Sequence, residues 1–496
     1  MAQYINTNIA SINSQRNLST SQSALATSLQ RLSSGLRINS AKDDSAGMSI
    51  ASRMSSQING LDQARRNAND GVSLAQTGEG ALSTAGDMLQ RIRELAVQSS
   101  NATNTSSDRA ALQAEANQLT SELDRMASTT QFNGQNLLDG SMSATTFQVG
   151  ANANQTITAT TANFHTANYG NYRIGSLAAT TSGGIGDLTV GSSADALAGN
   201  SAAATRVVGG TFDINGAAGS KTITYVGGDS AKTVAAAVNA VTGNTGVTAS
   251  AKTEFDLSAL SVSSAFSLAI TSNNATAVTI TFNTGAVANA DGLAAGIKAF
   301  NDVAATTGVT AKLNTAGTGI TLTNADGENI NMTNNSALAA TTYTAGTGAA
   351  TAGAGGVSFG TGSLTLDSNN SFGVANANTT DFFGIAAASS QLQKVNQIDI
   401  SSVEGANRAI MQVDSALATV NSQRAQYGAL QSRFSSTIAN LMSSSENLTA
   451  ARSRIQDTDF AAETGALTRA QILQQAGTAM LAQSNAVPNG VMALLR

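Results

Sequence analysis

The sequence predicts a mainly α-helical protein at both termini, where long antiparallel helices form a coiled coil, with a β-rich α+β insert between them. We expect these parts to make an elongated multidomain hairpin. Both ends carry Leu, Ile, Val, Met and Ala at alternating spacings of three and four, the pattern of a coiled-coil seam. Between about residues 176 and 389 apolar and polar residues instead alternate, which is the period of a strand. Pro488 is the only proline, and a proline inside a helix costs about 3 kcal/mol.

The first predicted helix covers residues 5–36, and its later leucines are spaced four, three and four apart. The run 42–50 interrupts it and supplies Asp and Ser side chains that can cap helices. A second helix is predicted from near Ile50 to about Ser99. Its clearest seam is formed by Leu82, Ala85, Leu89, Ile92 and Ala96.

A turn over residues 101–108, closed by Asp108 as a helix cap, leads to a third predicted helix. The apolar residues of that helix are Leu112, Ala116, Leu119, Leu123 and Met126. Residues 132–140 follow with Asn-Gly and Asp-Gly turn dipeptides, which predict the beginning of strand-like structure.

The carboxyl-terminal end repeats the helical pattern. An apolar stripe begins at Ala406 and continues to about Ile455, which predicts one long helix. A turn at 456–460 separates it from a last helix. The stripe of this last helix is Leu473, Ala476, Met480, Val487, Val491 and Leu494.

The middle of the chain contains an imperfect internal repeat. Strand patterns at 211–216 and 221–226 precede a short amphipathic helix at about 230–242, and a similar order recurs around a helix at about 290–304. The motif TGVTA occurs at 245–249 and again at 307–311. Each repeat is therefore predicted to be a hairpin, a helix and a returning strand. We expect the Ala/Thr/Gly-rich stretch at about 339–363 to be loose or to lie at a sheet edge.

Composition argues against an enzyme and against bound cofactors. The chain has no Cys and a single His, so disulfides, thiolate zinc sites, thiol catalysis and a histidine-paired metalloprotease motif are excluded. Only 11% of residues are charged and the net charge is −5. The acidic excess lies in the middle, the two ends are balanced, and no basic patch predicts nucleic-acid binding. Neither a general secretory signal peptide nor a membrane-spanning stretch is recognisable.

Two groups of residues resemble ligand sites without meeting their patterns. The carboxylates of Asp43, Asp44, Asp457 and Asp459 are expected to cap helices at two turns rather than to bind a cation. The stretch 216–222 lacks the glycine that precedes the lysine of a phosphate-binding loop. We therefore predict neither a metal site nor a nucleotide site.

Four segments in the right order resemble bacterial flagellin. They are the opening MAQYINTNIASINSQRNLS, the turn RLSSGLRINSAKDDSAGMSIA (31–51), LQRIRELAVQSSNAT (89–103), and the ending from SRIQDTDF to NGVMALLR (453–496). The central repeats resemble the hook-IN type of module. The resemblance implies a secreted structural subunit of the flagellar filament, used for swimming motility, that leaves the cell through the flagellar type III export apparatus.

In that family the outermost helices form the inner tube of the filament and the next helices form its wall. Mapped onto this chain, residues 1–42 and 456–496 would be the inner coiled coil, 43–175 and 390–455 the wall domain, and 176–389 an exposed insert with two hook-IN-like repeats. The implied partners are further copies of the chain, an export chaperone, the filament cap, hook-associated proteins and the Toll-like receptor that recognises flagellin. Two alternatives remain open: a hook–filament junction protein, and a surface adhesin that binds glycans through the insert.

The resemblance also implies which residues carry these roles. Filament packing is expected of Ile5, Ile9, Ile12, Leu25, Leu29, Leu32, Leu36, Leu473, Met480, Val487, Val491, Leu494, Leu495 and Arg496. Contact with the immune receptor is expected of Gln90, Arg91, Leu95, Glu115 and Arg433.

Physical reasoning adds one expectation about the ends. Ordering the backbone costs about 1–2 kcal/mol per residue, whereas burial of apolar surface returns only about 25 cal/mol per Å². A thin Ala/Leu seam barely offsets that cost. We therefore expect both terminal segments to be disordered in the free monomer and to fold when neighbouring subunits cover them.

Overall fold

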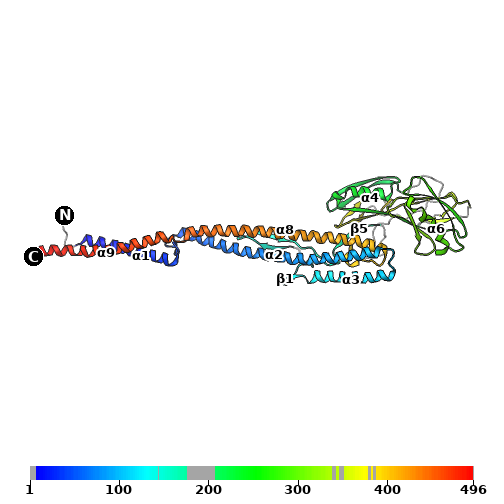
Figure 1. The fold of residues 1–496 in the computed structure, drawn as a ribbon. Helices are drawn as coiled ribbons and strands as arrows, with labels where there is room; N and C mark the ends of the chain where they lie inside the picture. The colour runs from blue at the N-terminus through cyan, green and yellow to red at the C-terminus, as the bar shows by residue number, and fades with distance from the viewer. Residues whose placement is uncertain are drawn as a thin grey trace. The chain divides into compact units, whose positions relative to one another are not determined.

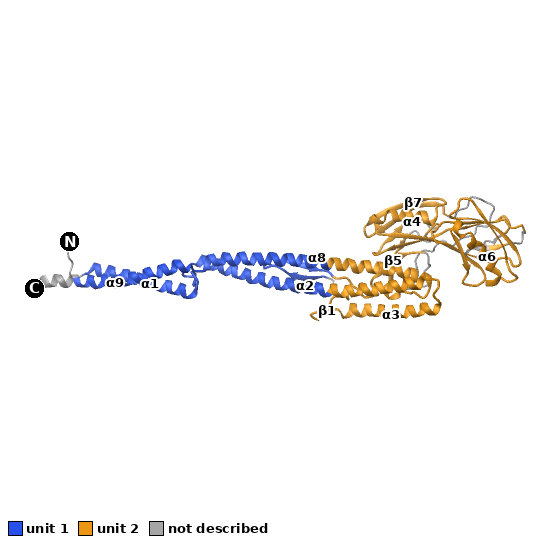
Figure 2. Ribbon diagram, in the orientation of Figure 1, with its two compact units in different colours: residues 1–77, 144–160, 427–496 blue, residues 78–143, 161–426 orange. Residues whose placement is uncertain are grey.

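The computed structural model describes residues 7–142, 144–175, 207–337, 342–345, 351–377, 381–383 and 387–494. The chain divides into two compact units, which Figure 2 colours separately. Unit 1 comprises 1–77, 144–160 and 427–496, and unit 2 comprises 78–143 and 161–426. Each unit therefore combines segments that are far apart in the sequence. The three-part domain division expected above stays a prediction.

Long helices form both ends of the chain and strands dominate its middle (Figure 1), which confirms the predicted fold class. The long helices are α1 (Ile9–Ser34), α2 (Ser45–Ser100), α3 (Ser106–Thr129), α8 (Val403–Gln456) and α9 (Phe460–Leu494). The short helices of the middle are α4 (Ala231–Ala240), α5 (Thr242–Thr245), α6 (Ala290–Asp302) and α7 (Ala304–Thr307).

The strands are short and form separate sheets. The first strands are β1 (Gln131–Phe132), β2 (Gln135–Asn136), β3 (Thr145–Gln148), β4 (Thr156–Ala159) and β5 (Gly170–Ile174). Those of the repeats are β6 (Gly209–Gly216), β7 (Gly219–Val226), β8 (Thr248–Ser258), β9 (Ala265–Thr271), β10 (Val278–Asn283) and β11 (Val309–Leu313). The last are β12 (Ile320–Asn324), β13 (Ile330–Asn334), β14 (Tyr343–Ala345), β15 (Thr351–Ala352), β16 (Val357–Gly360), β17 (Ser363–Ser368), β18 (Gly373–Ala375), β19 (Ala388–Ser389) and β20 (Gln391–Lys394).

Polar side chains cap the first turns of long helices, as the sequence predicted. The Oδ1 of Asp44 accepts a hydrogen bond from the backbone N–H of Gly47 (2.8 Å), and the Oδ1 of Asp459 accepts from Ala461 (2.9 Å). Both carboxylates thus act as the expected caps. The assignment of Asp108 as a cap was wrong by three residues. Thr105 is the cap of α3, and the carboxylate of Asp108 accepts a hydrogen bond from the backbone N–H of Thr105, which forms a capping box.

In unit 1, small residues of α2 make room for the β3–β4 hairpin and for an aromatic side chain of α8. The Phe434 ring is fully buried and meets the Phe147 ring edge to face, with 5.5 Å between ring centroids. A Cβ at Gly71 would lie 2.5 Å from the tip of the Phe434 ring, so only glycine allows this packing. Asn67 donates from Nδ2 to the carbonyl of Gln148 (2.9 Å) and fixes the hairpin to α2.

In unit 2, the predicted seam of α2 is the helical core. Leu82, Ala85, Leu89, Ile92 and Ala96 are each at most 1% exposed. The matching positions of α8 are also buried, which confirms the apolar stripe expected for that helix. They include Ala406, Val413 and Val420, and Ile410 and Leu417 are half-buried.

The two stretches of the internal repeat have the same order of elements. The order β6–β7–α4–α5–β8 recurs as β9–β10–α6–α7–β11. In the first stretch the side-chain amide of Asn239 exchanges two hydrogen bonds with the backbone of Ala249, and Asn301 does the same with Ala311 in the second. Gly246 and Gly308, the glycines of the TGVTA motifs, have positive φ values of 73° and 70° where α5 and α7 end.

The chain that follows the second repeat adds strands to the sheets of both repeats. The sheet β19–β18–β6–β7 closes over the first and the sheet β10–β9–β13–β16 over the second, while β8 and β11 belong to a third sheet of order β11–β12–β8–β17–β5–β20. Strand β16 pairs with β13 at the edge of its sheet, so this described part of 339–363 lies at a sheet edge, which is one of the two expected outcomes, and is not loose. Buried aromatic rings fill each repeat: Phe212, Tyr225, Phe382 and Phe383 in the first, and Phe266, Phe282 and Phe300 in the second.

Candidate functional site

Helices α1 and α9 of unit 1 pack along one another, and we call them the terminal helix pair. The side chains that are buried or half-buried recur at spacings of three and four in both helices, so the contact has coiled-coil geometry. On α1 this seam consists of Ser11, Ser14, Leu18, Ser21, Leu25, Ser28 and Leu32. On α9 it consists of Glu463, Leu467, Ala470, Gln474, Gly477, Leu481 and Ser484.

Only part of the predicted apolar stripe lies in the seam of this pair: Leu25 and Leu32 do, whereas other members of the stripe are exposed. Ile9, Ile12, Leu29, Leu473 and Met480 are between 51% and 61% exposed. Small and polar residues occupy the seam in their place. The physical reason is that the apolar residues of each helix occupy more than one heptad position, and a single partner helix can cover only one seam.

The other residues expected to pack in a filament are placed as follows. Leu25, Leu32 and Leu36 are half-buried, the first two in the seam. Ile5, Leu495 and Arg496 lie outside the described residues. Val487, Val491 and Leu494 belong to the backbone of α9, and the structure does not describe their side chains.

Polar contacts hold the terminal helix pair in place. The Nδ2 of Asn8 donates to the carbonyl of Ser484 (2.8 Å), and the Oγ of Ser11 donates to the Oδ1 of Asn485 (2.8 Å). At the other end of the pair the guanidinium of Arg31 lies 3.6 Å from the carboxylate of Glu463.

A backbone bridge also connects the two turns that adjoin the pair. Leu36 and Asp457 form this bridge, and the backbone N–H of Arg37 donates to the carbonyl of Gln456 (2.7 Å).

In unit 2, the exposed face of α2 and α3 carries three of the residues expected to contact the immune receptor. Gln90, Arg91 and Glu115 are exposed. The Arg91 Nε donates to a Glu115 carboxylate oxygen (2.9 Å), and its Nη1 donates to Glu94 (3.0 Å). The hydrogen bonds that Arg91 donates, first that to Glu115 and then that to Glu94, raise the pKa of its guanidinium above the ordinary value. The face therefore presents an ordered cation flanked by two carboxylates.

Of the two remaining receptor residues, one is buried and the other belongs to unit 1. Leu95 is 1% exposed and belongs to the helical core, so it supports the face from beneath instead of presenting a side chain to a partner. Arg433 is exposed on the part of α8 that belongs to unit 1, so it belongs to a different unit from Arg91.

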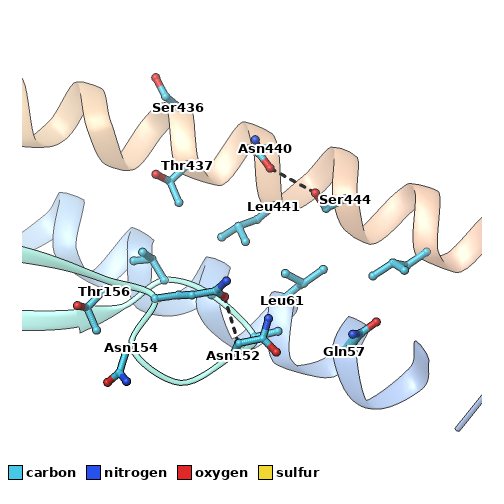
Figure 3. A pocket seen from close by; sticks show the side chains of 15 residues that line it. Gln57, Leu61, Asn152, Asn154, Thr156, Ser436, Thr437, Asn440, Leu441 and Ser444 are labelled. Atoms are coloured by element: carbon cyan, nitrogen blue, oxygen red, sulfur yellow. Dashed lines mark hydrogen bonds between the residues drawn. The ribbon is translucent and has the colours of Figure 1, made fainter. Parts of the chain in front are cut away.

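A pocket of about 790 Å³ in unit 1 lies among α2, α8 and the β3–β4 hairpin (Figure 3). Leu61, Leu441 and Leu448 form its apolar part, and amides such as Asn152 and Asn440 its polar part. None of its lining residues is an acid, a base or a nucleophile with a partnered base. The pocket therefore offers no arrangement for catalysis.

Carboxylates of the described residues do not gather into a metal site. In that part of the chain no three His, Asp or Glu side chains are arranged to hold a metal ion. Asp43 instead accepts hydrogen bonds from Ser40, and the Nδ1 of His165 contacts the carboxylate of Asp124 at 3.1 Å. Within the same described ranges, every helix is too short or too polar to cross a membrane.

Two features escaped the sequence reasoning. Serines 14, 21 and 28 recur every seven residues in α1, which could have revealed the polar seam. The buried ion pair between Arg173 and Asp367 (2.7 Å) left no such signal, because strand pairing alone brings β5 and β17 together.

Three family descriptions match the sequence: the N-terminal helical region of bacterial flagellin over residues 5–143, its C-terminal helical region over 410–495, and the flagellin hook IN motif over 211–265. The B-type flagellin of Pseudomonas aeruginosa is 42% identical over an alignment that covers 100% of both chains. The flagellin of Salmonella typhimurium is 38% identical and flagellin D of Vibrio cholerae 33% identical, again over 100% of each chain.

Proposed function

The chain belongs to the bacterial flagellin family and is a structural subunit of the extracellular flagellar filament rather than an enzyme; we propose that its terminal helix pair joins it to neighbouring copies. The exposed apolar side chains of the pair are the observation that carries this proposal. Ile9, Ile12, Ile472, Leu473 and Met480 are all more than half exposed. Water-exposed apolar residues in such number on two helices are stabilised when another protein surface covers them.

The partner that fits these exposed apolar side chains is an identical copy of the chain. The Arg31–Glu463 salt bridge within unit 1 and the balance of basic and acidic residues at the two ends leave no strong field that would repel a second copy. The export chaperone, the export apparatus, the filament cap and the hook-associated proteins are further proposed partners, on the basis of family membership alone. The junction-protein and glycan-binding alternatives gain no support, because relatives matched over their full length are named flagellins.

Seeded growth tests the proposal. Short filament fragments added to purified monomer should elongate, and negative-stain microscopy should show filaments of uniform diameter. Protein that stays monomeric with seeds, over a range of salt concentrations that includes salting-out conditions, would contradict it.

We also propose that the exposed face around Arg91 is recognised by the Toll-like receptor for flagellin. A fixed guanidinium between Glu115 and Glu94 gives a partner a defined charge pattern at known positions. Glu115 and Gln90 extend the same face, and Leu95 keeps α2 packed beneath it.

Replacing Arg91 with Ala should reduce receptor signalling by purified monomer about tenfold or more, because an interface arginine that anchors binding is worth about 2 kcal/mol. The matched control is Arg125→Ala, since Arg125 is also exposed and paired with a carboxylate on α3. Both variants should unfold at temperatures close to that of the unaltered protein, because exposed ion pairs contribute about 0–1 kcal/mol. Equal signalling by the two variants would remove the receptor proposal.

A further inference from the structure

Pro488 leaves a backbone group of helix α9 without its usual partner. The helix runs from Phe460 to Leu494, so Pro488 lies within it. Proline has no backbone N–H and cannot donate to the carbonyl of the residue four positions earlier, which is Ser484. Ser484 is only 9% exposed, so water has little access to this carbonyl. A buried carbonyl without a donor is costly, and a donor from elsewhere is expected.

Asn8 supplies that donor from the other helix of the pair. Its Nδ2 donates to the Ser484 carbonyl at 2.8 Å, and its Oδ1 accepts from the backbone N–H of Ser11 at 3.1 Å. The second hydrogen bond caps the beginning of α1. One side-chain amide therefore caps the beginning of α1 and also donates to the Ser484 carbonyl of α9.

The apolar part of the seam defines the relative register of the two helices only weakly, so polar contacts such as those of Asn8, Ser11 and Arg31 have to fix it. Leu18, Leu25 and Leu32 recur every seven residues on α1, with serines between them. A slip of α1 along α9 by seven residues would therefore return leucine and serine to seam positions. A polar group with one matching partner is the device that fixes register in helix pairs of this kind.

We propose that Asn8, together with the other polar contacts of the pair, sets the register of the terminal helix pair by donating to the seam carbonyl that Pro488 deprives of its helical donor. The inference rests on the proposed function, because the pair is proposed to order during assembly. Asn8 is thus a positioning residue for assembly. It is tied to Pro488 although the two lie at opposite ends of the chain. Aspartate at position 8 could cap α1 but could not donate, and serine could cap α1 but is too short to reach α9 as well.

A double-mutant cycle tests this coupling. Asn8→Ser keeps a capping oxygen, so it removes mainly the bond to Ser484. Pro488→Ala restores a backbone donor to the same carbonyl. We expect Asn8→Ser to raise the critical concentration for filament growth about tenfold, which corresponds to about 1.4 kcal/mol. In the Pro488→Ala background the same change should raise it less than about twofold.

A disulfide reporter reads the register separately from filament growth, in protein oxidised under seeding conditions, where the pair is expected to be ordered. The chain has no native Cys, and the Oγ atoms of Ser14 and Ser484 are 3.5 Å apart. Ser14→Cys combined with Ser484→Cys should therefore cross-link within one chain under mild oxidation. Asn8→Ser should lower the yield at least about threefold, Pro488→Ala should restore it, and the matched control Asn17→Ser should not change it, since Asn17 is exposed on α1.

The two readouts separate the two proposals. If filaments grow but Asn8→Ser leaves the cross-link yield unchanged, the role of Asn8 is overturned. The same holds if Asn8→Ser lowers the yield equally with Pro and with Ala at position 488. A cross-link yield that follows the expected pattern in protein that never forms filaments supports that role and overturns the proposed function. No cross-link in any variant shows that the pair has no fixed register and also overturns the inference.

Discussion

Replacing Leu473 and Met480 with aspartate should abolish filament growth at concentrations that support it in the unaltered protein. Both side chains are more than half exposed in the described chain and lie outside the seam with α1. If neighbouring copies cover them, the variant must bury two carboxylates without partners, which costs several kcal/mol. We expect the critical concentration to rise at least about 100-fold, equivalent to about 2.7 kcal/mol.

The control for this variant carries the same charges at polar positions of the same helix. Gln475 and Gln483 are exposed on α9, and Gln475→Asp with Gln483→Asp should change the critical concentration less than about fivefold, because surface charge changes have small effects. Sedimentation after seeding measures both. If the two double variants behave alike, charge rather than the apolar face controls assembly.

The second large effect is expected at the buried ion pair of unit 2. Arg173 and Asp367 lie directly opposite each other on β5 and β17, and both side chains are 6% exposed. The Asp367 carboxylate also accepts from Asn171, whose Oδ1 accepts from Ser415 of α8 (3.3 Å). The network thus connects the sheet to the long helix. Asp367→Ala would leave the guanidinium buried without its partner and should lower the free energy of unfolding of unit 2 by about 3–5 kcal/mol.

An exposed ion pair in the same unit provides the comparison. The guanidinium of Arg93 contacts Asp414 at 2.6 Å, with side chains 45% and 49% exposed. Asp414→Ala should cost less than about 1 kcal/mol because solvent screens this pair. Urea unfolding followed by circular dichroism measures both changes. Equal losses for the two variants would show that burial does not set the strength of the Arg173–Asp367 pair.

The periodicity of apolar residues in the sequence was sufficient to predict the fold class. The spacing of Leu82, Leu89 and Ile92 identified the buried face of α2, and these side chains are fully buried in the structure. The repeated TGVTA motif marked equivalent turns, and the structure shows why: each glycine ends a short helix with positive φ, and the following strand is bound to an Asn of the preceding helix. Such features are local, so one chain segment determines them.

Features that depend on pairing between distant segments could not be predicted. The apolar residues of α1 fit more than one seam, and only contact with α9 selects Leu18 and Leu25 over Ile9 and Ile12. The resemblance implied Leu95 as a receptor contact beside Arg91, yet its side chain is buried in the core. The role of Asn8 depends on a proline at the opposite end of the chain.

The central claim is that the terminal helices are incomplete alone and become stable among identical copies. Helix α1 contributes only Ser28 as a buried residue, whereas the unit 2 part of α2 buries Leu82, Leu89 and Ile92 completely. Amide hydrogen exchange on dilute monomer and on filaments compares the two helices directly. We predict rapid exchange over residues 9–34 in the monomer, slow exchange there in the filament, and slow exchange over residues 78–100 in both. Slow exchange over residues 9–34 in dilute monomer would contradict the claim.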